Sequence, residues 1–331
     1  MTRWVVRCVL LVFVALTVLA VPASAADRFA LIVSGASGGD KYAENQKKWL
    51  ASLESTLRER LAFAGDRLVI LSEGAAEANN ATRDNVTRAL TTLRQRVTAD
   101  DVLLVVLIGH GTFDGQSAKF NLIGPDMSAE EWKKLLEGIP GRLVFVNTTS
   151  SSFPFIEELS GQNRVIISAT DTSAQKYDTV FPEYFIKGLA EVSADNDKNG
   201  RLSVFEAFSY ANQAVKQYYD QQGQLATERS LIDDNGVTIN MHVPAQPASA
   251  GAQPAAPPTA VLARMTYLDP EPGSTTANPV LAALQKQKAS LEAQIEGLKL
   301  RKGELTQPQY DAELERLAIE LARVTAKLSG R

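Results

Sequence analysis

The sequence predicts an α/β domain built on a mostly parallel sheet, with helices covering both faces and a helical hairpin at the C-terminus. Short apolar runs alternate with segments of helical periodicity from residue 26 to about residue 242. These runs lack the alternation of a half-exposed strand, so both faces of the sheet should be buried. Beyond a proline-rich stretch, two leucine-rich segments keep heptad spacing, which is typical of paired helices.

The elements of the sheet domain follow from this alternation. The expected strands are residues 29–33, 67–71, 102–108, 143–146 and 165–168. The expected helices between them are residues 43–63, 82–97, 128–136 and 155–159. One helix start is well marked, because Ser128 and Glu131 have the spacing of a capping box.

The first 25 residues have the pattern of a secretory signal peptide. Arg3 and Arg7 precede an apolar stretch at residues 8–21, and a triplet of small residues ends at Ala25. The stretch is shorter than the roughly 20 residues that span a bilayer, so we expect cleavage after Ala25 and no membrane span afterwards. The expected product is a periplasmic or secreted protein without cysteine, because Cys8 is the only cysteine of the chain.

Composition excludes one class of partner. The chain has 331 residues, of which 45% are hydrophobic, and this is enough for a full-sized core. Its formal net charge is −4, and this becomes −6 once Arg3 and Arg7 leave with the signal peptide. A mildly acidic chain without long charge runs is not typical of nucleic-acid binding, so we expect no nucleic-acid partner.

The last quarter of the chain divides into a linker and a hairpin. Residues 243–279 hold eight of the fourteen prolines, which predicts a disordered linker. In residues 280–331, two amphipathic helices flank Gly303, and Thr306 with Gln309 caps the second. The apolar seam positions are Leu281, Leu284, Leu291, Ile295, Leu298, Tyr310, Leu314, Leu317, Leu321, Val324 and Leu328. Such a hairpin buries little alone, so we expect it to pack on the main domain, a second copy or another protein.

A histidine between two glycines follows the most apolar of the expected strands. His110 stands in Gly109-His110-Gly111, directly after residues 102–108. Open α/β sheets bind ligands at the carboxyl ends of their strands, and glycine lets backbone N–H groups approach an oxyanion. Both a catalytic histidine and a histidine that only hydrogen-bonds within a turn fit this pattern.

Three segments together resemble the legumain group of cysteine peptidases, family C13, which has the caspase-haemoglobinase fold. They are residues 31–39 with Tyr42, Gly109-His110-Gly111, and residues 143–146 continuing into 147–152. The resemblance spans about 200 residues, from residue 30 to about residue 235. It implies a caspase-like sheet with His110 as the catalytic histidine, and Gly111 as a contributor to the oxyanion hole.

The chain departs from that group at two positions. Thr148 stands at the position of the nucleophilic cysteine, and Ala43 aligns with a basic residue of the substrate pocket. A thiol is partly ionised at neutral pH, whereas an alcohol needs a well-aligned base. The favoured interpretation is an exported pseudopeptidase that binds a peptide or protein partner. The alternatives are a hydrolase in which His110 activates Thr148, Thr149 or Ser150, and a scaffold that acts through the hairpin.

A complete EF-hand loop occupies residues 195–206, between helices expected at 182–192 and from 204 to about 219. The expected ligands are Asp195, Asp197, Asn199, the Arg201 carbonyl, Ser203 and Glu206. Seven oxygens with a bidentate glutamate suit Ca²⁺ better than Mg²⁺, so we expect a structural calcium site. A helix-to-helix turn without an ion is the alternative. A second acidic stretch at residues 233–236 is expected only to form a turn.

Overall fold

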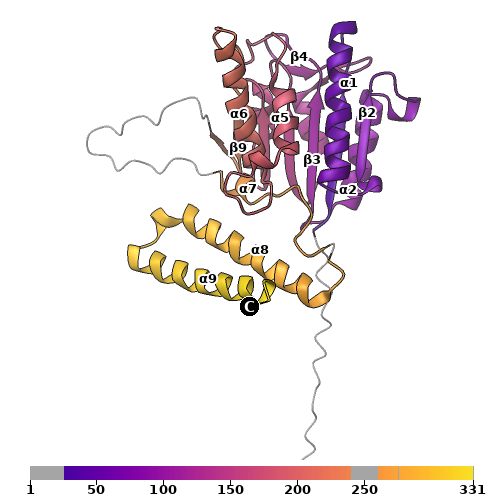
Figure 1. Cartoon of the computed structure of the whole chain (residues 1–331). Coiled ribbons are helices and arrows are strands. Elements are labelled where there is room, and N and C mark those ends of the chain that lie inside the picture. The colour runs from indigo at the N-terminus through magenta and orange to yellow at the C-terminus, as the bar shows by residue number, and fades with distance from the viewer. Residues whose placement is uncertain (1–25, 240–259, 275, 331) are drawn as a thin grey trace, which may run out of the picture.

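The computed structural model describes residues 26–239, 260–274 and 276–330; the predicted signal peptide and residues 243–259 of the predicted linker lie outside them. The domain is built on a seven-stranded sheet in the order β10-β9-β8-β7-β3-β1-β2 (Figure 1). Its strands are β1 (Arg28–Ser34), β2 (Leu68–Ser72), β3 (Val102–Ile108), β7 (Arg142–Asn147), β8 (Arg164–Ser168), β9 (Leu231–Asp234) and β10 (Val237–Ile239). Five strands run parallel and β9 and β10 are antiparallel to their neighbours, so the predicted mostly parallel sheet is confirmed.

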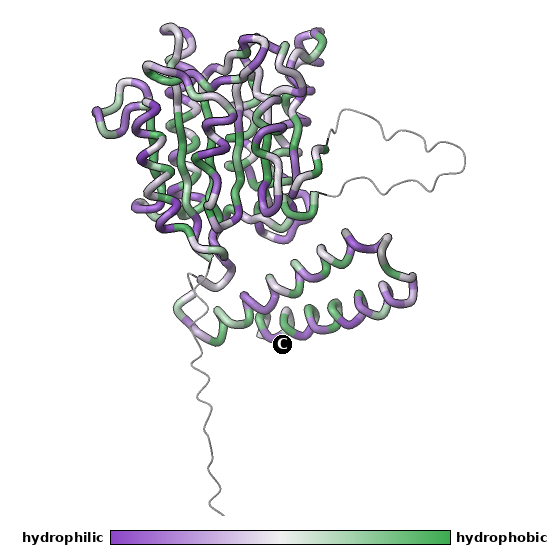
Figure 2. Tube along the Cα trace, turned by 180° about the vertical axis from the view of Figure 1, so that it is seen from behind, coloured by the Kyte–Doolittle hydropathy of each residue, from purple (hydrophilic) through white to green (hydrophobic). Residues whose placement is uncertain are grey.

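Helices cover both faces of this sheet, as predicted. On one face lie α1 (Asp40–Ser55), α5 (Phe181–Ala190), α6 (Val204–Gln221) and α7 (Val261–Arg264). On the other face lie α2 (Arg83–Arg96), α3 (Ala129–Leu136) and α4 (Phe153–Leu159). Neighbouring strand residues divide between the two cores, with Ile32 in one and Leu31 and Val33 in the other. Every residue of β3 is buried, which explains its unbroken apolar run (Figure 2).

Several elements differ from the prediction in length or in kind. Helix α1 begins three residues early and continues as one π-helical turn, Thr56–Arg60. A small second sheet was not predicted and consists of β4 (Gly111–Phe113), β5 (Ala118–Phe120) and β6 (Met127–Ser128). The predicted turn at residues 233–236 contains only Asn235 and Gly236, which both have positive φ, and the two aspartates before them end β9.

Residues 260–274 correct the linker prediction, because this part of the chain is ordered on the domain. It forms α7, in which Ala263 has no exposed surface, and an extended segment in which Thr266 and Leu268 have none. The Asp234 carboxylate accepts hydrogen bonds from two backbone N–H groups at the start of α7. Proline content indicated a linker, but the segment is held by partners on distant strands that local composition does not reveal.

The predicted C-terminal hairpin consists of α8 (Pro279–Leu300) and α9 (Gln307–Leu328). Its buried residues form a small core of their own, made of Leu291, Leu298, Tyr310, Leu317 and Val324. Thr306 and Gln309 form the capping box at the start of α9. The hairpin lies beyond the end of the sheet at which the parallel strands begin (Figure 1). None of the helices in the described ranges is long and apolar enough to cross a membrane.

Candidate functional site

His110 lies at the carboxyl ends of the parallel strands, with both ring nitrogens facing acceptors. Its Nε2 lies 2.8 Å from the Ser37 carbonyl oxygen, and its Nδ1 lies 3.2 Å from Asp178 Oδ1. A carbonyl oxygen only accepts, so Nε2 carries a proton in this contact. The Tyr42 ring meets the imidazole edge-on at 4.9 Å, and its hydrogen bond to Asp178 raises the pKa of Tyr42. The imidazole is thus oriented by Ser37 and Asp178.

The hydroxyl-rich loop after β7 is a buried hydrogen-bond network. Thr148, at the nucleophile position, is 1% exposed, and its Oγ1 donates to the Leu107 carbonyl at 2.7 Å. Ser150 Oγ donates to the Gly111 carbonyl at 3.0 Å. The remaining hydroxyl contacts are Thr149 to Asn147 Oδ1, Ser151 to the Gln175 carbonyl, and Ser152 with Thr170. Each hydroxyl of the loop therefore has a partner other than His110.

Gly111 packs directly against this loop. A Cβ at position 111 would lie 2.2 Å from the Ser150 carbonyl oxygen and 2.5 Å from Thr149 Oγ1. The glycine also begins β4, where it pairs with Phe120. The packing of the protein itself therefore requires glycine here, and the oxyanion role implied by the resemblance stays a prediction.

Two buried amides beside the loop carry polar atoms without a hydrogen-bond partner in the described part of the chain. They are Asn147 Nδ2, at the end of β7, and both side-chain polar atoms of Gln175. The Gln175 backbone carbonyl accepts from Ser151, which places this residue against the loop. Unpaired polar groups in a protein interior commonly mark a bound water or ligand.

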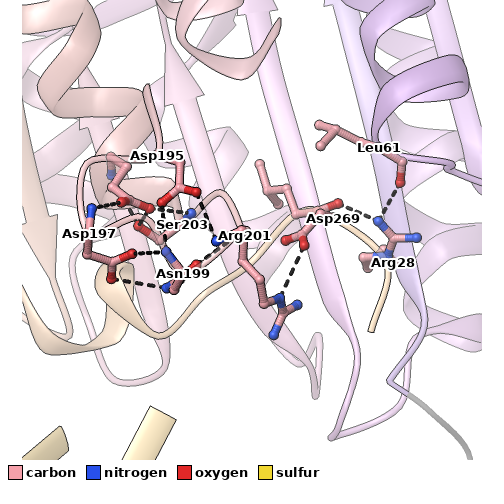
Figure 3. Close-up of polar contacts among 11 residues, drawn as sticks. Arg28, Leu61, Asp195, Asp197, Asn199, Arg201, Ser203 and Asp269 are labelled. Atoms are coloured by element: carbon pink, nitrogen blue, oxygen red, sulfur yellow. Dashed lines mark hydrogen bonds and ion pairs between the residues drawn. The ribbon is translucent and has the colours of Figure 1, made fainter. Parts of the chain in front are cut away.

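The predicted calcium loop joins α5 to α6 and has its acidic residues brought together. Oxygens of Asp195, Asp197 and Glu206 lie within 4.8 Å of one another. Lys198 and Gly200 adopt φ of 58° and 80°, which turns the loop sharply. The Asp195 carboxylate accepts from the N–H of Gly200 at 2.9 Å, so its side chain points into the loop (Figure 3).

The other predicted ligands lie on the same loop. Asn199 Oδ1 accepts from the Arg201 N–H at 2.7 Å, and Ser203 forms a capping box with Glu206 at the start of α6. Partial desolvation is the main cause of a raised pKa at Asp197, which stays exposed on one side, and the carboxylates of Glu206, Glu296 and Asp195 add to it. A divalent cation would relieve this crowding of negative charge, and the oxygen-only donor set fits Ca²⁺.

Two residues that contact the loop were not predicted from sequence. Arg201 forms an ion pair with Asp269 at 3.1 Å, and its guanidinium lies 3.9 Å above the Tyr267 ring. Both partners belong to the segment that composition assigned to the linker. The available sequence signal was that Tyr267 and Asp269, an aromatic and a charged residue, stand at the end of an apolar stretch. Nothing near them in the chain indicates that they contact Arg201.

The two candidate sites lie at opposite ends of the sheet. His110 follows the carboxyl end of β3, whereas the segment that contacts the calcium loop lines a cavity with Arg28, Val102 and Arg142, where β1, β3 and β7 begin. In Figure 1, β4 lies at one end of the sheet, and α7 and the hairpin lie at the other end. An ion in the loop would therefore stabilise the fold without contacting His110.

No protein-family model matches the chain, and no curated protein matches it. Among solved structures it is similar to protein GSU0716 from Geobacter sulfurreducens, at 12% identity and a TM-score of 0.38 over 57% of this chain and 89% of that one. It is also similar to the Drosophila initiator caspase Dronc, at 13% identity and a TM-score of 0.41 over 64% and 80%. For drICE the identity is 12% and the TM-score 0.39 over 59% and 84%.

Proposed function

We propose that this chain is an exported, non-proteolytic binding module with a caspase-like domain of legumain-like descent. The observation that carries the proposal is the buried loop at Thr148–Ser152, in which every hydroxyl already has a partner other than His110. An oxygen nucleophile must pass its proton to a base within hydrogen-bond reach during attack. The contacts of Thr148 Oγ1 and of the imidazole therefore favour the pseudopeptidase over the hydroxyl-dependent hydrolase.

A peptide or protein partner is the class of ligand we propose for the carboxyl end of the sheet. The unpaired Asn147 Nδ2 and the unpaired side-chain amide of Gln175 support this choice, because amide groups recognise a peptide backbone through hydrogen bonds. The place also agrees with the general position of ligand sites in open α/β sheets.

Hydrolysis assays test the absence of peptidase activity. The mature chain, incubated with a mixture of fluorogenic peptides, should give no cleavage above the buffer rate, and His110→Ala should leave this result unchanged. A random-peptide display library provides the binding arm, in which enriched peptides should lose affinity for Gln175→Ala. Cleavage that disappears in both His110→Ala and Thr148→Ala would overturn the proposal and favour the hydrolase.

We also propose that the loop at residues 195–206 holds a structural Ca²⁺ ion. The support is the complete ligand spacing together with the convergence of Asp195, Asp197 and Glu206. Ca²⁺ bound there would join α5 to α6, and Asn199, Ser203 and the Arg201 carbonyl would complete the oxygen ligands.

Calorimetry tests the calcium site. Titration of Ca²⁺ into the metal-free mature chain should show binding to one site and raise the thermal midpoint, because an ion that binds only the folded state stabilises it. Glu206→Ala should abolish both effects. Glu183→Ala, on the preceding helix outside the loop, is the matched control and should leave calcium binding intact. Equal binding by the Glu206→Ala chain would exclude this loop as the site.

A further inference from the structure

The calcium loop has an antiparallel partner within its own chain. The Val204 N–H donates to the Thr266 carbonyl at 2.8 Å, and Leu268 donates to the Leu202 carbonyl at 3.4 Å. Ser203 and Tyr267 form the bridge between them. The bridge therefore fixes the stretch of loop that contains two expected ligands, the Arg201 carbonyl and Ser203.

Arg201 contacts both the loop and this partner segment. Its carbonyl is an expected calcium ligand, while its side chain binds Asp269 (Figure 3). The same guanidinium lies over the Tyr267 ring. Both side chains of the ion pair are less than one-fifth exposed. Screening by water is weaker there than at the surface, so the pair should restrain the loop.

The partner segment is anchored on the sheet and leads into the hairpin. Arg28 donates to the Leu268 carbonyl, and Arg142 donates to Thr266 Oγ1 at 3.1 Å. Beyond it, Glu271 pairs with Lys286 of α8 at 3.5 Å. A displacement of the loop would therefore reach α8 through a short, continuous series of contacts.

The hairpin also brings a charge to the loop. Glu296 of α8 lines a cavity of about 260 Å³ together with Asp197, Glu206 and Arg264. The Arg264 guanidinium lies 3.8 Å above the Phe205 ring and carries the opposing charge. Without a metal ion, Arg264 offsets part of the repulsion between Glu296 and these carboxylates. A bound Ca²⁺ would make the approach of Glu296 more favourable.

We propose that Ca²⁺ binding in the loop and docking of the C-terminal hairpin are coupled, through the segment at residues 266–269 and through Glu296. The inference rests on the proposed calcium site. Coupling of this kind is reciprocal: the ion favours the docked hairpin, and the docked hairpin raises the affinity for the ion by the same factor.

Spin-label distances test the coupling in the full mature chain. Because no other cysteine remains after signal cleavage, Gln217→Cys on α6 and Ala322→Cys on α9 provide a clean pair of exposed sites. The interspin distance distribution should be broad in chelator and should narrow when Ca²⁺ saturates the loop. Identical distributions in both conditions, with calcium bound, would overturn the coupling.

Two variants test the contacts that link the calcium loop to the hairpin and leave the predicted calcium ligands in place. Arg201→Ala keeps the backbone carbonyl but loses the contacts with Tyr267 and Asp269, so calcium affinity should fall at least about fivefold. Glu296→Gln removes the charge that the hairpin brings to the loop and should also weaken calcium binding. The control, Arg316→Ala, removes exposed ion pairs on α9 and should change neither readout.

The outcomes distinguish the two proposals. An unmodified chain that binds no Ca²⁺ would refute the calcium site itself. Normal calcium affinity in both Arg201→Ala and Glu296→Gln would refute the coupling and leave the site intact.

Discussion

Position 111 shows how far the packing at single residues can be predicted from sequence. The motif around His110 indicated a strand end with a functional glycine, and His110 does lie at the end of β3. The sequence did not reveal that Gly111 contacts the Ser150 carbonyl or that Asp178 faces the imidazole. These contacts join loops that are distant in the chain, so no local pattern contains them.

Replacing Gly111 with alanine should destabilise the fold. The new Cβ would overlap the Ser150 carbonyl oxygen, and the buried loop cannot move without losing hydrogen bonds. We expect the free energy of unfolding to fall by about 1–3 kcal/mol, the usual cost of overpacking, as measured by urea denaturation.

Gly297→Ala is the matched control for that substitution. Gly297 lies within α8, and a Cβ there meets no atom within 4 Å. Because alanine favours a helix over glycine by about 0.5–1 kcal/mol, this variant should be as stable as the unmodified chain or slightly more so. Equal stability of Gly111→Ala and the unmodified chain would contradict the prediction and show that the loop at residues 148–152 shifts to accommodate the new Cβ.

At the scale of elements, the long buried strands and the capped helices were predictable and the short elements were not. Burial on both faces gives β3 its continuous apolar run, and a capping box marks the start of α3. By contrast, β4–β6 have two or three residues each, too few for a periodic signal. Tertiary hydrogen bonds determine such elements.

The start of α5 depends on a buried glutamate that no motif indicated. The Glu228 carboxylate accepts from the backbone N–H groups of Val180 and Phe181, at 2.8 and 3.2 Å, and from the Tyr219 hydroxyl at 3.1 Å. Burial raises the pKa of Glu228 to about 7, although these donors act in the opposite direction. The folded protein therefore binds this proton more tightly than the unfolded chain does.

The free energy of unfolding should consequently depend on pH between the ordinary pKa of glutamate, 4.5, and the pKa of about 7 that Glu228 has in the folded protein. As pH rises from about 4.5 towards 7, the unfolded chain releases the proton first, so the free energy of unfolding should fall by up to about 3 kcal/mol and then level off. Urea unfolding across this range measures the fall. Glu228→Gln should remove it, and Glu183→Gln, which changes an exposed carboxylate of α5, should retain it. A fall of the same size in Glu228→Gln would exclude Glu228 as its origin.

At the scale of the whole molecule, the layers of the domain and the hairpin could be predicted from the sequence. The contacts of residues 260–274, which connect the two, could not. The heptad seam predicted two paired helices, which α8 and α9 form around their own core. Nothing in that seam shows that residues 260–274 bind the amino ends of the strands. Arginines on β1 and β7 hold this segment, largely through backbone carbonyls, which any sequence provides.

The contact between Arg28 and Leu268 has a consequence for how the chain acquires its fold. These residues are 240 positions apart, so the donor at the start of β1 is synthesised long before its acceptor. Contacts of such long range form slowly, because a large loop must close before they contribute. Closure of the domain at this end is thus expected to be a late event, and a chain cut off before residue 260 would leave the starts of its parallel strands open to other molecules.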